Sequence, residues 1–429
     1  MSSSILRLSL CIVVMASLAG CGGSSSGGSG GGGGGSPTTV TFTFNGSTDS
    51  VAPAVVATQT GTGTYALAAL SSGKLTIEVP NGETNFSVAY LCPPEVEAIP
   101  FPAQNYEYIT EASTLDGTSF SGSCFVSNSA QTGVATVQVN AAAIPGAAGV
   151  AVDGYPMPWS DGTLDFSATI PAGTYDVPIT VSKGEYYDTY DNYLAIKILR
   201  AQTVPGALNG GASVVFGASD EVVPQTITYN NLPAGFSAFS PLVLYETSNG
   251  GSILLDLFGS PTQYLAVPSG AYQSGDTYLI SVGAGGALGG GSAGGVGAEI
   301  FTATGGPQTF TFPSPWSYAG PTPAALPTFN FVYSGFSGKS NVSQYVNLSW
   351  DEGTTSFNAI SMSATANYQN GSTSMTIPDL SSLTGFLVPA TSGTAINWNA
   401  DIIQSSISGT NPPSGTSLNV SNSGAYTEP

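Results

Sequence analysis

The sequence predicts an all-β fold built of tandem antiparallel β-sandwiches of the immunoglobulin-like type. Apolar and polar residues alternate in short runs, such as TVTFTF at residues 39–44 and KLTIEV at residues 74–79, as expected for strands that bury one face. Pro, Gly, Asn and Asp separate these runs, and after the N-terminal segment no stretch keeps a helical period over about three turns. Further alternating runs lie at residues 134–139, 164–170, 309–312, 328–333, 345–350 and 395–402.

The composition limits the chemistry that the chain can perform. Lys and Arg total 6 against 26 Asp and Glu, a net charge of −20, yet only 7% of the 429 residues are charged. Such an acidic surface repels phosphate backbones, so nucleic acid is not an expected partner. The chain contains no histidine, which excludes Ser-His-Asp and Cys-His catalysis and imidazole metal sites. We therefore expect a protein that is not an enzyme.

The N-terminal segment has the features of an export signal. Arg7 precedes an apolar run at residues 8–19, which is shorter than the ~20 residues that span a bilayer. The run ends in the sequence LAGC, with its cysteine at Cys21, and it resembles the lipobox of bacterial lipoproteins. This resemblance implies removal of residues 1–20, a lipid on Cys21 and a place in the cell envelope. The alternative is an ordinary signal peptide cut after Gly20, which would leave Cys21 unmodified.

The residues after the cysteine favour a particular location. Gly22 follows Cys21 where an aspartate would favour inner-membrane retention, so the resemblance implies anchoring in the outer membrane, facing either the periplasm or the outside. Residues 22–36 are all Gly or Ser and form a flexible tether.

The remaining cysteines predict one disulfide. Cys11 leaves with the signal and Cys21 carries lipid, so Cys92 and Cys124 remain as a pair in an oxidising compartment. Two free thiols are the alternative, and no CxxC spacing suggests redox or metal chemistry.

The spacing of the strands predicts several modules. The predicted divisions are a signal peptide at 1–20, a lipidated cysteine with its tether at 21–37, and sandwich modules at 38–130, 131–205, 206–318 and 325–429. An apolar-Pro-small-Gly phrase recurs between strands at residues 77–92, 168–183 and 265–282, with a looser copy at 231–246, and it predicts a hairpin in each case. Residues 134–200 resemble β-sandwich repeats of unknown function from exported bacterial proteins, which implies architecture only.

Two segments are predicted to lack strands. Residues 283–299 (GAGGALGGGSAGGVGAE) predict a long glycine-rich loop within the third module. Residues 313–327 contain five prolines and predict an extended, semi-rigid linker that holds the last module at a set distance.

Two polar and aromatic segments are candidate binding loops. Residues 183–193 combine carboxylates with tyrosines, which suits a sugar or, as an alternative ligand, a calcium ion; no other cofactor is expected. The plainer interpretation is a solvated hairpin tip. Residues 152–163 offer Asp153 and Asp161 beside a tryptophan. The tryptophan suits stacking on a sugar, and the two aspartates suit a glycosidase carboxylate pair. The plainer interpretation is a turn with a partly buried tryptophan. The candidate ligand-binding residues are Trp159, Tyr155, Tyr186, Tyr187, Tyr190, Asp188 and Asp191.

These observations predict a lipid-anchored envelope protein with a binding, adhesive or structural role. Polysaccharide is the most specific expected ligand, and an envelope protein is the other candidate partner. The competing hypothesis is a glycan hydrolase that uses paired carboxylates, or an accessory module of one. Trp350 and Trp398 lie within alternating runs and are expected in the core.

Overall fold

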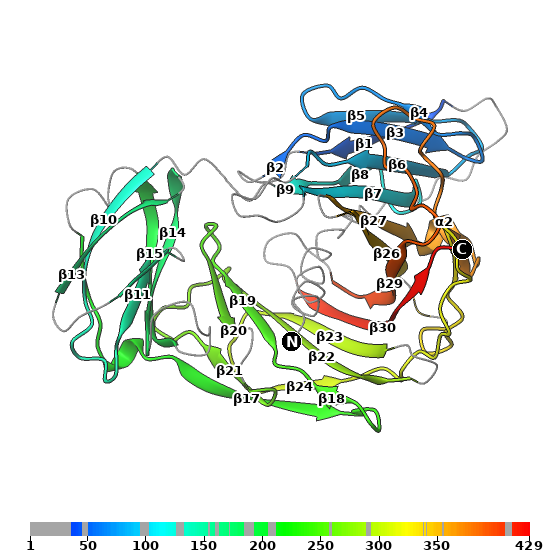
Figure 1. Ribbon diagram of the computed structural model, residues 1–429. Coiled ribbons are helices and arrows are strands. Elements are labelled where there is room, and N and C mark those ends of the chain that lie inside the picture. The colour runs from blue at the N-terminus through cyan, green and yellow to red at the C-terminus, as the bar shows by residue number, and fades with distance from the viewer. Residues whose placement is uncertain are drawn as a thin grey trace.

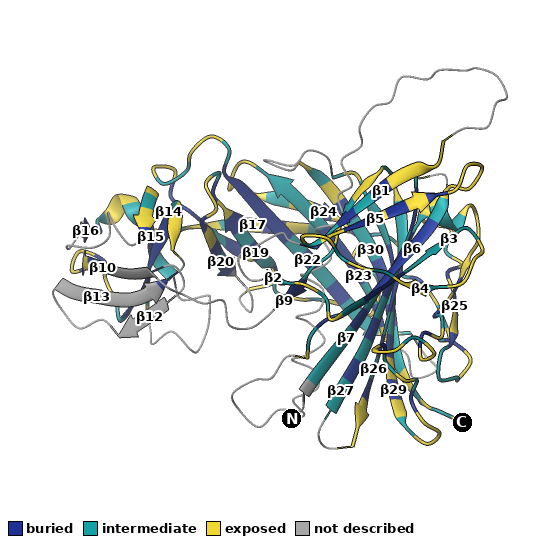
Figure 2. Cartoon of the chain, turned by 90° about the horizontal axis from the view of Figure 1, so that it is seen from above, coloured by how far each residue is buried: buried dark blue, intermediate teal, exposed yellow. Residues whose placement is uncertain are grey.

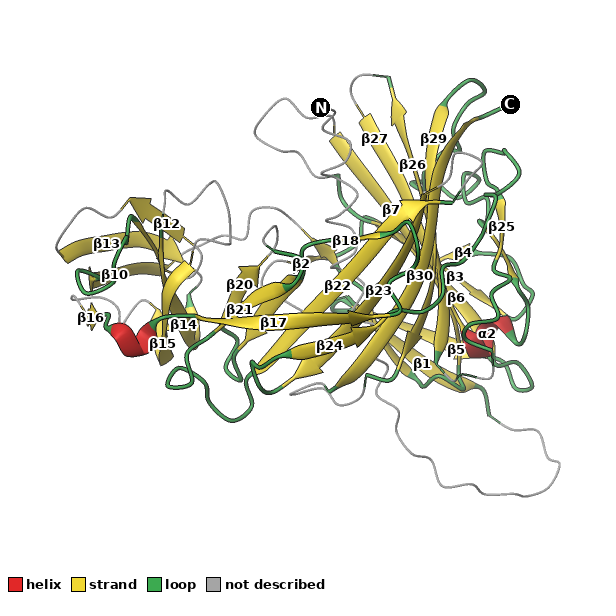
Figure 3. Cartoon of the chain, turned by 90° about the horizontal axis from the view of Figure 1, so that it is seen from below, coloured by secondary structure: helices red, strands yellow, loops and turns green. Residues whose placement is uncertain are grey.

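The computed structural model describes residues 36–44, 50–94, 103–125, 133–152, 155–158, 163–170, 172–183, 193–204, 212–256, 260–288, 293–337, 339, 341–353, 356–407 and 414–429. Nearly all regular structure in these ranges is strand (Figure 3). The exceptions are two helical turns, η3 (Ala218–Asp220) and α2 (Ala366–Gln369). The all-β prediction is confirmed.

The strands form four sandwiches that repeat one topology. In each of the first three, a small sheet places the first strand between the fourth and the seventh. The opposing sheet has the order third, second, fifth, sixth. The first and seventh strands run parallel. An immunoglobulin-like sandwich instead places its first, second, fourth and fifth strands in one sheet, so the immunoglobulin-like arrangement that the sequence predicted is not confirmed.

The bounds of the strands follow chain order. The first sandwich contains β1 (Thr38–Thr43), β3 (Val55–Thr60), β4 (Ala66–Leu67), β5 (Lys74–Val79), β6 (Asn85–Leu91), β7 (Ala103–Ser113) and β8 (Ser119–Ser121). The second contains β10 (Gly133–Asn140), β11 (Gly149–Val152), β12 (Tyr155–Pro158), β13 (Thr163–Ile170), β14 (Gly173–Ser182), β15 (Tyr193–Val204) and β16 (Ala212–Val215). The third contains β17 (Val223–Asn230), β19 (Leu242–Glu246), β20 (Ser252–Asp256), β21 (Gln263–Ala266), β22 (Thr277–Ala287), β23 (Ala293–Thr302) and β24 (Gln308–Thr311).

The fourth sandwich has six strands within the described ranges. They are β25 (Thr328–Asn330), β26 (Val342–Glu352), β27 (Ser356–Thr365), β28 (Ser374–Thr376), β29 (Ala395–Ser405) and β30 (Gly415–Thr427). Three short strands lie outside the repeated scheme: β2 (Ser50–Val51) pairs with β9 (Cys124–Phe125), and β18 (Ser237–Ala238) pairs with β22.

The larger sheets of the first, third and fourth sandwiches merge into one. Their strands follow the order β20-β19-β22-β23-β30-β29-β26-β27-β7-β6-β3-β4. The junctions are the antiparallel pair β23–β30 and the parallel pair β27–β7. Figure 1 shows that this large sheet curves, with β17 and β24 on its outer side.

The alternating sequence runs explain the cores. Val40, Phe42 and Phe44 are fully buried against the larger sheet of the first sandwich, and Leu75 and Ile77 of β5 are buried beside them. Figure 2 shows that buried residues follow the strands and that exposed residues gather in loops and at strand ends. Burial of these faces supplies about 25 cal/mol per Å² of apolar surface, so alternation is what fixes each strand in its layer.

The recurring Pro-Gly phrase forms a crossing between sheets and not the hairpin that the sequence predicted. It connects β5 to β6, β13 to β14 and β21 to β22, and in each case the two strands lie in opposite sheets of one sandwich. In the first and third sandwiches, both flanking strands have apolar alternation and turn their apolar face toward the core between the sheets. The phrase therefore marks the same position in three sandwiches.

The glycine-rich segment is not the loop that the sequence predicted. Described residues from 283 to 299 continue β22 and β23, which pair with each other from Tyr278 to Ala287. The absence of side chains lets neighbouring groups lie over these strands, as described below for the candidate site.

The proline-rich segment does not act as an extended spacer. Trp316 is 2% exposed, and its ring stacks on Tyr318 with ring centroids 4.9 Å apart and on Phe331 at 5.5 Å. The Trp316 indole donates to the carbonyl of Val332, and the Tyr318 hydroxyl accepts from the amide of Asn330. The segment thus packs against the edge of β25, in a core that also buries Trp350 and Trp398 as predicted.

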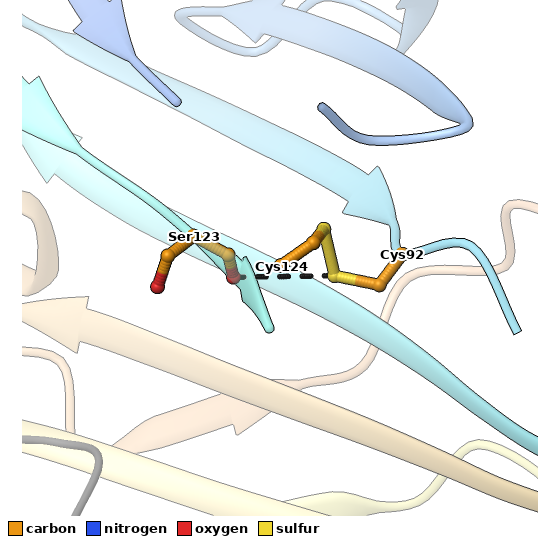
Figure 4. Close-up of a disulfide and its surroundings, with 3 residues drawn as sticks. All are labelled: Cys92, Ser123 and Cys124. Carbon is orange, nitrogen blue, oxygen red and sulfur yellow. Dashed lines mark hydrogen bonds between the residues drawn. A yellow bond between two sulfur atoms is a disulfide. The ribbon is translucent and has the colours of Figure 1, made fainter. Parts of the chain in front are cut away.

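The predicted disulfide is present. Cys92, directly after β6, joins Cys124 of β9 with an S–S distance of 2.01 Å (Figure 4). Both cysteines are buried in the core of the first sandwich. The bond ties the end of β6 to the short β2–β9 pair, closing a loop with a sequence separation of 32.

A buried ion cluster joins the second and third sandwiches. Arg200 of β15 donates to Asp176 of β14 at 2.7 Å and to Asp276, directly before β22, at 2.6 and 3.1 Å. Both carboxylates are fully buried. Burial alone would raise the pKa of Asp276, but hydrogen bonds from Arg200, Tyr245 and backbone amides outweigh it and hold that pKa below its usual value. Arg200 is therefore the cation that allows two buried acids to remain charged.

We predict that Arg200→Met destabilises the protein by about 3–5 kcal/mol, because the variant leaves two buried carboxylates without their cation. Urea unfolding at pH 7 measures the change. Arg200→Lys keeps the positive charge but loses the planar guanidinium group that bonds both carboxylates, so its free energy of unfolding should lie between those of wild type and Arg200→Met. Equal stability of the three proteins would contradict this role.

Candidate functional site

The large sheet has one apolar and one polar face where it passes through the third and fourth sandwiches. In AINWNADI, residues 395–402, the apolar residues Ile396, Trp398 and Ala400 are buried in the core, and the alternating Asn399 and Asp401 lie on the opposite face. The small sheets of these sandwiches cover the apolar face, which is the convex one (Figure 1). The polar face therefore lies on the concave side. Its members are Ser281, Glu299, Tyr345, Asn347, Ser361, Asn399, Asp401, Asn419 and Ser421, and we call this set the polar face.

Strand register aligns these groups in rows across the sheet. Asp401 of β29 lies opposite Tyr345 of β26 and opposite Ser421 of β30, and Ser421 lies opposite Gly295 of β23. In the neighbouring row, Asn399 lies opposite Asn347. Directly opposed side chains in a sheet are close enough to act on one ligand. The first row presents hydroxyl and carboxyl groups side by side, and the neighbouring row presents two amides.

Glycines form the floor of the polar face on β22 and β23. A Cβ atom on Gly295 would lie 2.3 Å from Ser421 Oγ, and one on Gly297 would lie 2.0 Å from Asn419 Oδ1. The side chains of Ser421 and Asn419 therefore lie across β23, and any residue larger than glycine at position 295 or 297 would displace them. The glycine-rich composition, which predicted a loop, is thus explained by close packing on a strand.

An exposed aromatic ring lies at one end of the polar face. A Cβ atom on Gly285 would lie 2.6 Å from Phe239 Cζ, and one on Gly283 would lie 3.3 Å from Phe239 Cδ2. The Phe239 ring therefore rests on the glycines of β22, yet 56% of the residue is exposed. The ring is therefore accessible to a ligand at the point where it borders the polar face.

Hydrogen bonds fix several of the polar groups. Ser361 Oγ donates to Asn347 Oδ1 at 2.6 Å, and Ser281 Oγ donates to a Glu299 carboxylate oxygen at 3.2 Å. The Asn399 amide donates to Asp401 Oδ2. These contacts hold the side chains in place before any ligand arrives, and the amide oxygens and hydroxyls keep further acceptor positions.

The electrostatics of the polar face are acidic. Burial raises the pKa of Asp401, which is 8% exposed, to about 7, and the hydrogen bond from Asn399 offsets only part of the effect. Burial also raises the pKa of Glu299. Burial and the nearby Asp401 raise the pKa of Tyr345 to about 12. No strand of the large sheet contains a Lys or Arg, so no basic residue of this sheet compensates these acids.

The two acids of the polar face are too far apart for paired carboxylate chemistry. Ser421 and Gly295 connect them by register, and Glu299 lies two strands and four residues from Asp401. Strand spacing and rise give a backbone separation of about 16 Å, whereas glycosidase carboxylates lie roughly 5–10 Å apart. Asp401 and Glu299 are therefore suited to binding and not to a shared hydrolytic step.

The structure describes few of the ligand-binding residues that the sequence predicted. The backbone of Tyr155 belongs to β12 and lies opposite Val152 of β11. The other six candidates, Trp159, Tyr186, Tyr187, Tyr190, Asp188 and Asp191, lie outside the described residues, as does Cys21. Within the described ranges, no cluster of three or more His, Cys, Asp or Glu could hold a metal ion.

Sequence reasoning missed the polar face, although its signal was present. The alternation in residues 395–402 predicts a strand with Trp398 in the core, and the sequence assigns no role to the asparagines and the aspartate between the apolar positions. What the sequence did not show is that four neighbouring strands, distant along the chain, place such residues in register.

Comparisons with known proteins add no relative. No family model matches the chain, and no curated protein is similar to it. Among the described residues, no helix has the length and apolar character needed to cross a membrane.

We predict that Asp401→Asn stabilises the protein at alkaline pH. The pKa of Asp401 is higher in the folded state than its usual value near 3.8, so stability falls as pH rises from about 4 to about 7 and stays lower above that range. The asparagine variant lacks this loss and should gain on the order of 3 kcal/mol at pH 8, and little at pH 4. Urea unfolding at both pH values tests the difference, and an equal effect at pH 4 and pH 8 would contradict the assignment.

Proposed function

We propose that the protein is a lipid-anchored component of the bacterial cell envelope that binds polysaccharide on the polar face, without a catalytic role. The observation that carries the proposal is the alignment of amide, hydroxyl and carboxyl groups in rows on the concave side of the large sheet, next to the exposed ring of Phe239. The anchor is supported by the resemblance of residues 1–21 to a lipoprotein signal.

The chemistry of the polar face matches that of a sugar chain. Sugars present hydroxyl groups that donate and accept hydrogen bonds, and Asn, Ser and Asp side chains offer both functions. Sugar rings also have apolar faces that pack on aromatic rings, a role for which Phe239 is placed. From β22, beneath Phe239, to Tyr345 on β26 the face crosses four strand spacings, about 19 Å. An extended ligand fits this span better than a single small molecule.

The envelope location follows from the first residues of the chain. A lipid on Cys21 supplies membrane attachment through ~0.8 kcal/mol for each buried methylene. The Gly and Ser composition of residues 22–36 predicts a tether with a reach of roughly 20–23 Å. Such a tether would hold the sandwiches clear of the bilayer.

Glycan binding tests the function. On an array of neutral and charged glycans, residues 37–429 should bind extended polysaccharides, and both Phe239→Ala and Asn419→Ala should weaken binding by at least tenfold, because stacking and hydrogen bonds are lost. Asn330→Ala, on the exposed surface of β25, is the matched control and should bind as wild type. The array is read with and without calcium, since the tyrosine-rich segment at 183–193 offered a calcium site. No glycan signal, or equal binding by all variants, would reject the proposal.

Lipid attachment is tested separately. Cells expressing the full chain and grown with labelled palmitate should yield labelled protein, because acylation is expected at Cys21. Cys21→Ala should abolish the label. Cys11→Ala, within the segment removed by cleavage, should leave the label unchanged. Persistent label in Cys21→Ala would show that the anchor lies elsewhere.

A further inference from the structure

The first and fourth sandwiches meet along β7. On one side, β27 pairs with it in parallel, so that Ser356 to Ala364 lie opposite Ala103 to Glu111. Above the strand, the α2 turn and the connection at residues 377–394 cover the face that points away from the core of the first sandwich. Ile109 of β7 is 1% exposed and belongs to the core of the fourth sandwich. This face of β7 is therefore an interface between sandwiches.

Two glutamates lie on this buried face, on either side of Ile109. Glu107 and Glu111 are two residues from it in each direction, and side chains at this spacing share one face of a strand. Glu107 is 2% exposed, and its Oε2 accepts a hydrogen bond at 3.0 Å from the backbone amide of Leu387. Glu111 forms a side-chain hydrogen bond with Tyr368 of α2. Each acid thus contacts a different covering segment.

Hydrogen bonds that do not involve Glu107 or Glu111 also hold the α2 turn. Asn85 Nδ2 donates to the carbonyl of Tyr368 at 3.0 Å, and Asp116 accepts from Thr365 Oγ1 at 2.6 Å and from the Asn367 amide at 2.5 Å. The N-terminal end of α2 is therefore fixed to the end of β7 independently of Glu111. A change at Glu111 would act on the position of Tyr368 and not on the whole turn.

Among the described residues, no cation compensates the two glutamates. In the described part of the chain, the ionisable groups that act on them are Asp379 from the covering connection, Tyr368 from α2 and Tyr65 near β4. All three are acids. Tyr65 is itself bonded to Ser87 Oγ at 2.5 Å. Charging either glutamate would place a negative charge in a desolvated interface, where the hydrogen bonds from the Leu387 amide and from Tyr368 offset only part of the cost of burial.

We propose that the contact between the first and fourth sandwiches is a proton-operated latch, in which Glu107 and Glu111 must be uncharged for α2 and the connection at 377–394 to pack on β7. When both are protonated, the covering segments are closed over Ile109. When both are charged, hydration of the carboxylates favours an opened state in which the segments lift while the β7–β27 ladder remains.

The pH range of the latch follows from the two acids. Burial raises the pKa of Glu107 and of Glu111 from a usual value near 4.5 to about 7. With folded-state pKa values above those of the opened, solvated state, closure is strongest below about pH 4.5. It weakens as pH rises from 4.5 to 7 and stays weak above 7. The latch therefore closes on acidification.

Hydrogen exchange at the Leu387 amide tests the latch directly, because this amide is bonded to Glu107. The experiment uses residues 37–429 carrying Asp401→Asn, which removes the separate contribution of Asp401. After correction for intrinsic exchange, the opening equilibrium at Leu387 should rise at least tenfold from pH 5 to pH 8. In Glu107→Gln with Glu111→Gln it should stay near its pH 5 value, since the amides are permanently neutral and of similar shape.

The matched control is Glu78→Gln on the exposed side of β5, which should keep the wild-type pH dependence. The melting temperature gives a second readout: the double variant should melt several degrees above its parent at pH 8 and close to it at pH 5. Exchange at Leu387 that does not change with pH in the parent would overturn the proposal. An unchanged pH dependence in the double variant would also overturn it, and neither result bears on glycan binding.

Discussion

The architecture depends on the main-chain pairing between β7 and β27. Without this parallel ladder, the first sandwich would be joined to the fourth only by side-chain packing and by hydrogen bonds such as those of Asn85, Glu107 and Asp116. With it, the sixth strand of the first sandwich extends the sheet of the fourth, and β23–β30 extends the same sheet into the third. If the sandwiches were separate, each would have exposed sheet edges. Here these edges are paired, which removes sites of edge-to-edge association. The concave face exists only because these ladders place distant strands side by side.

The scarcity of basic residues shapes how this protein buries acids. The described Lys and Arg are Lys74, Lys183, Lys197, Arg200 and Lys339, and none lies on the large sheet. Between the second and third sandwiches, Arg200 neutralises Asp176 and Asp276, and both pKa values are lowered. On the large sheet, Glu107, Glu111 and Asp401 have no such partner among the described residues, and burial raises their pKa values to about 7. Carboxylic acids are thus held charged at the junction of the second and third sandwiches, whereas those at the junction of the first and fourth favour protonation. A change of pH therefore acts on the two junctions differently.

Local pattern predicted the strands but not their partners. Alternation in residues 39–44 and 74–79 predicted β1 and β5, because burial of one face is a local property of the sequence. The disulfide followed from counting cysteines. The Pro-Gly phrase was misinterpreted as a hairpin, because the same turn chemistry serves a crossing between sheets. The polar face could not be predicted, since it depends on register between β26, β29, β30 and β23, which are set by long-range pairing. The predicted binding loops lie largely outside the described residues and stay predictions.

The fourth sandwich shows how a repeated topology tolerates a missing part. Its small sheet has β25 and β28 but, in the described ranges, no strand at the position that β8, β16 and β24 occupy in the others. The segment from 314 to 318 lies there instead and bonds through side chains: the Trp316 indole to the Val332 carbonyl, and the Tyr318 hydroxyl to the Asn330 amide. Aromatic rings bury a large apolar surface, and here their polar atoms bond two backbone groups of the segment that contains β25. Since Asn422 of β30 also donates to the Trp316 carbonyl at 2.7 Å, the segment is fixed to the large sheet as well. The connection between the third and fourth sandwiches therefore serves as part of the core, and the curvature of the sheet that presents the polar face is held from its convex side by the same residues.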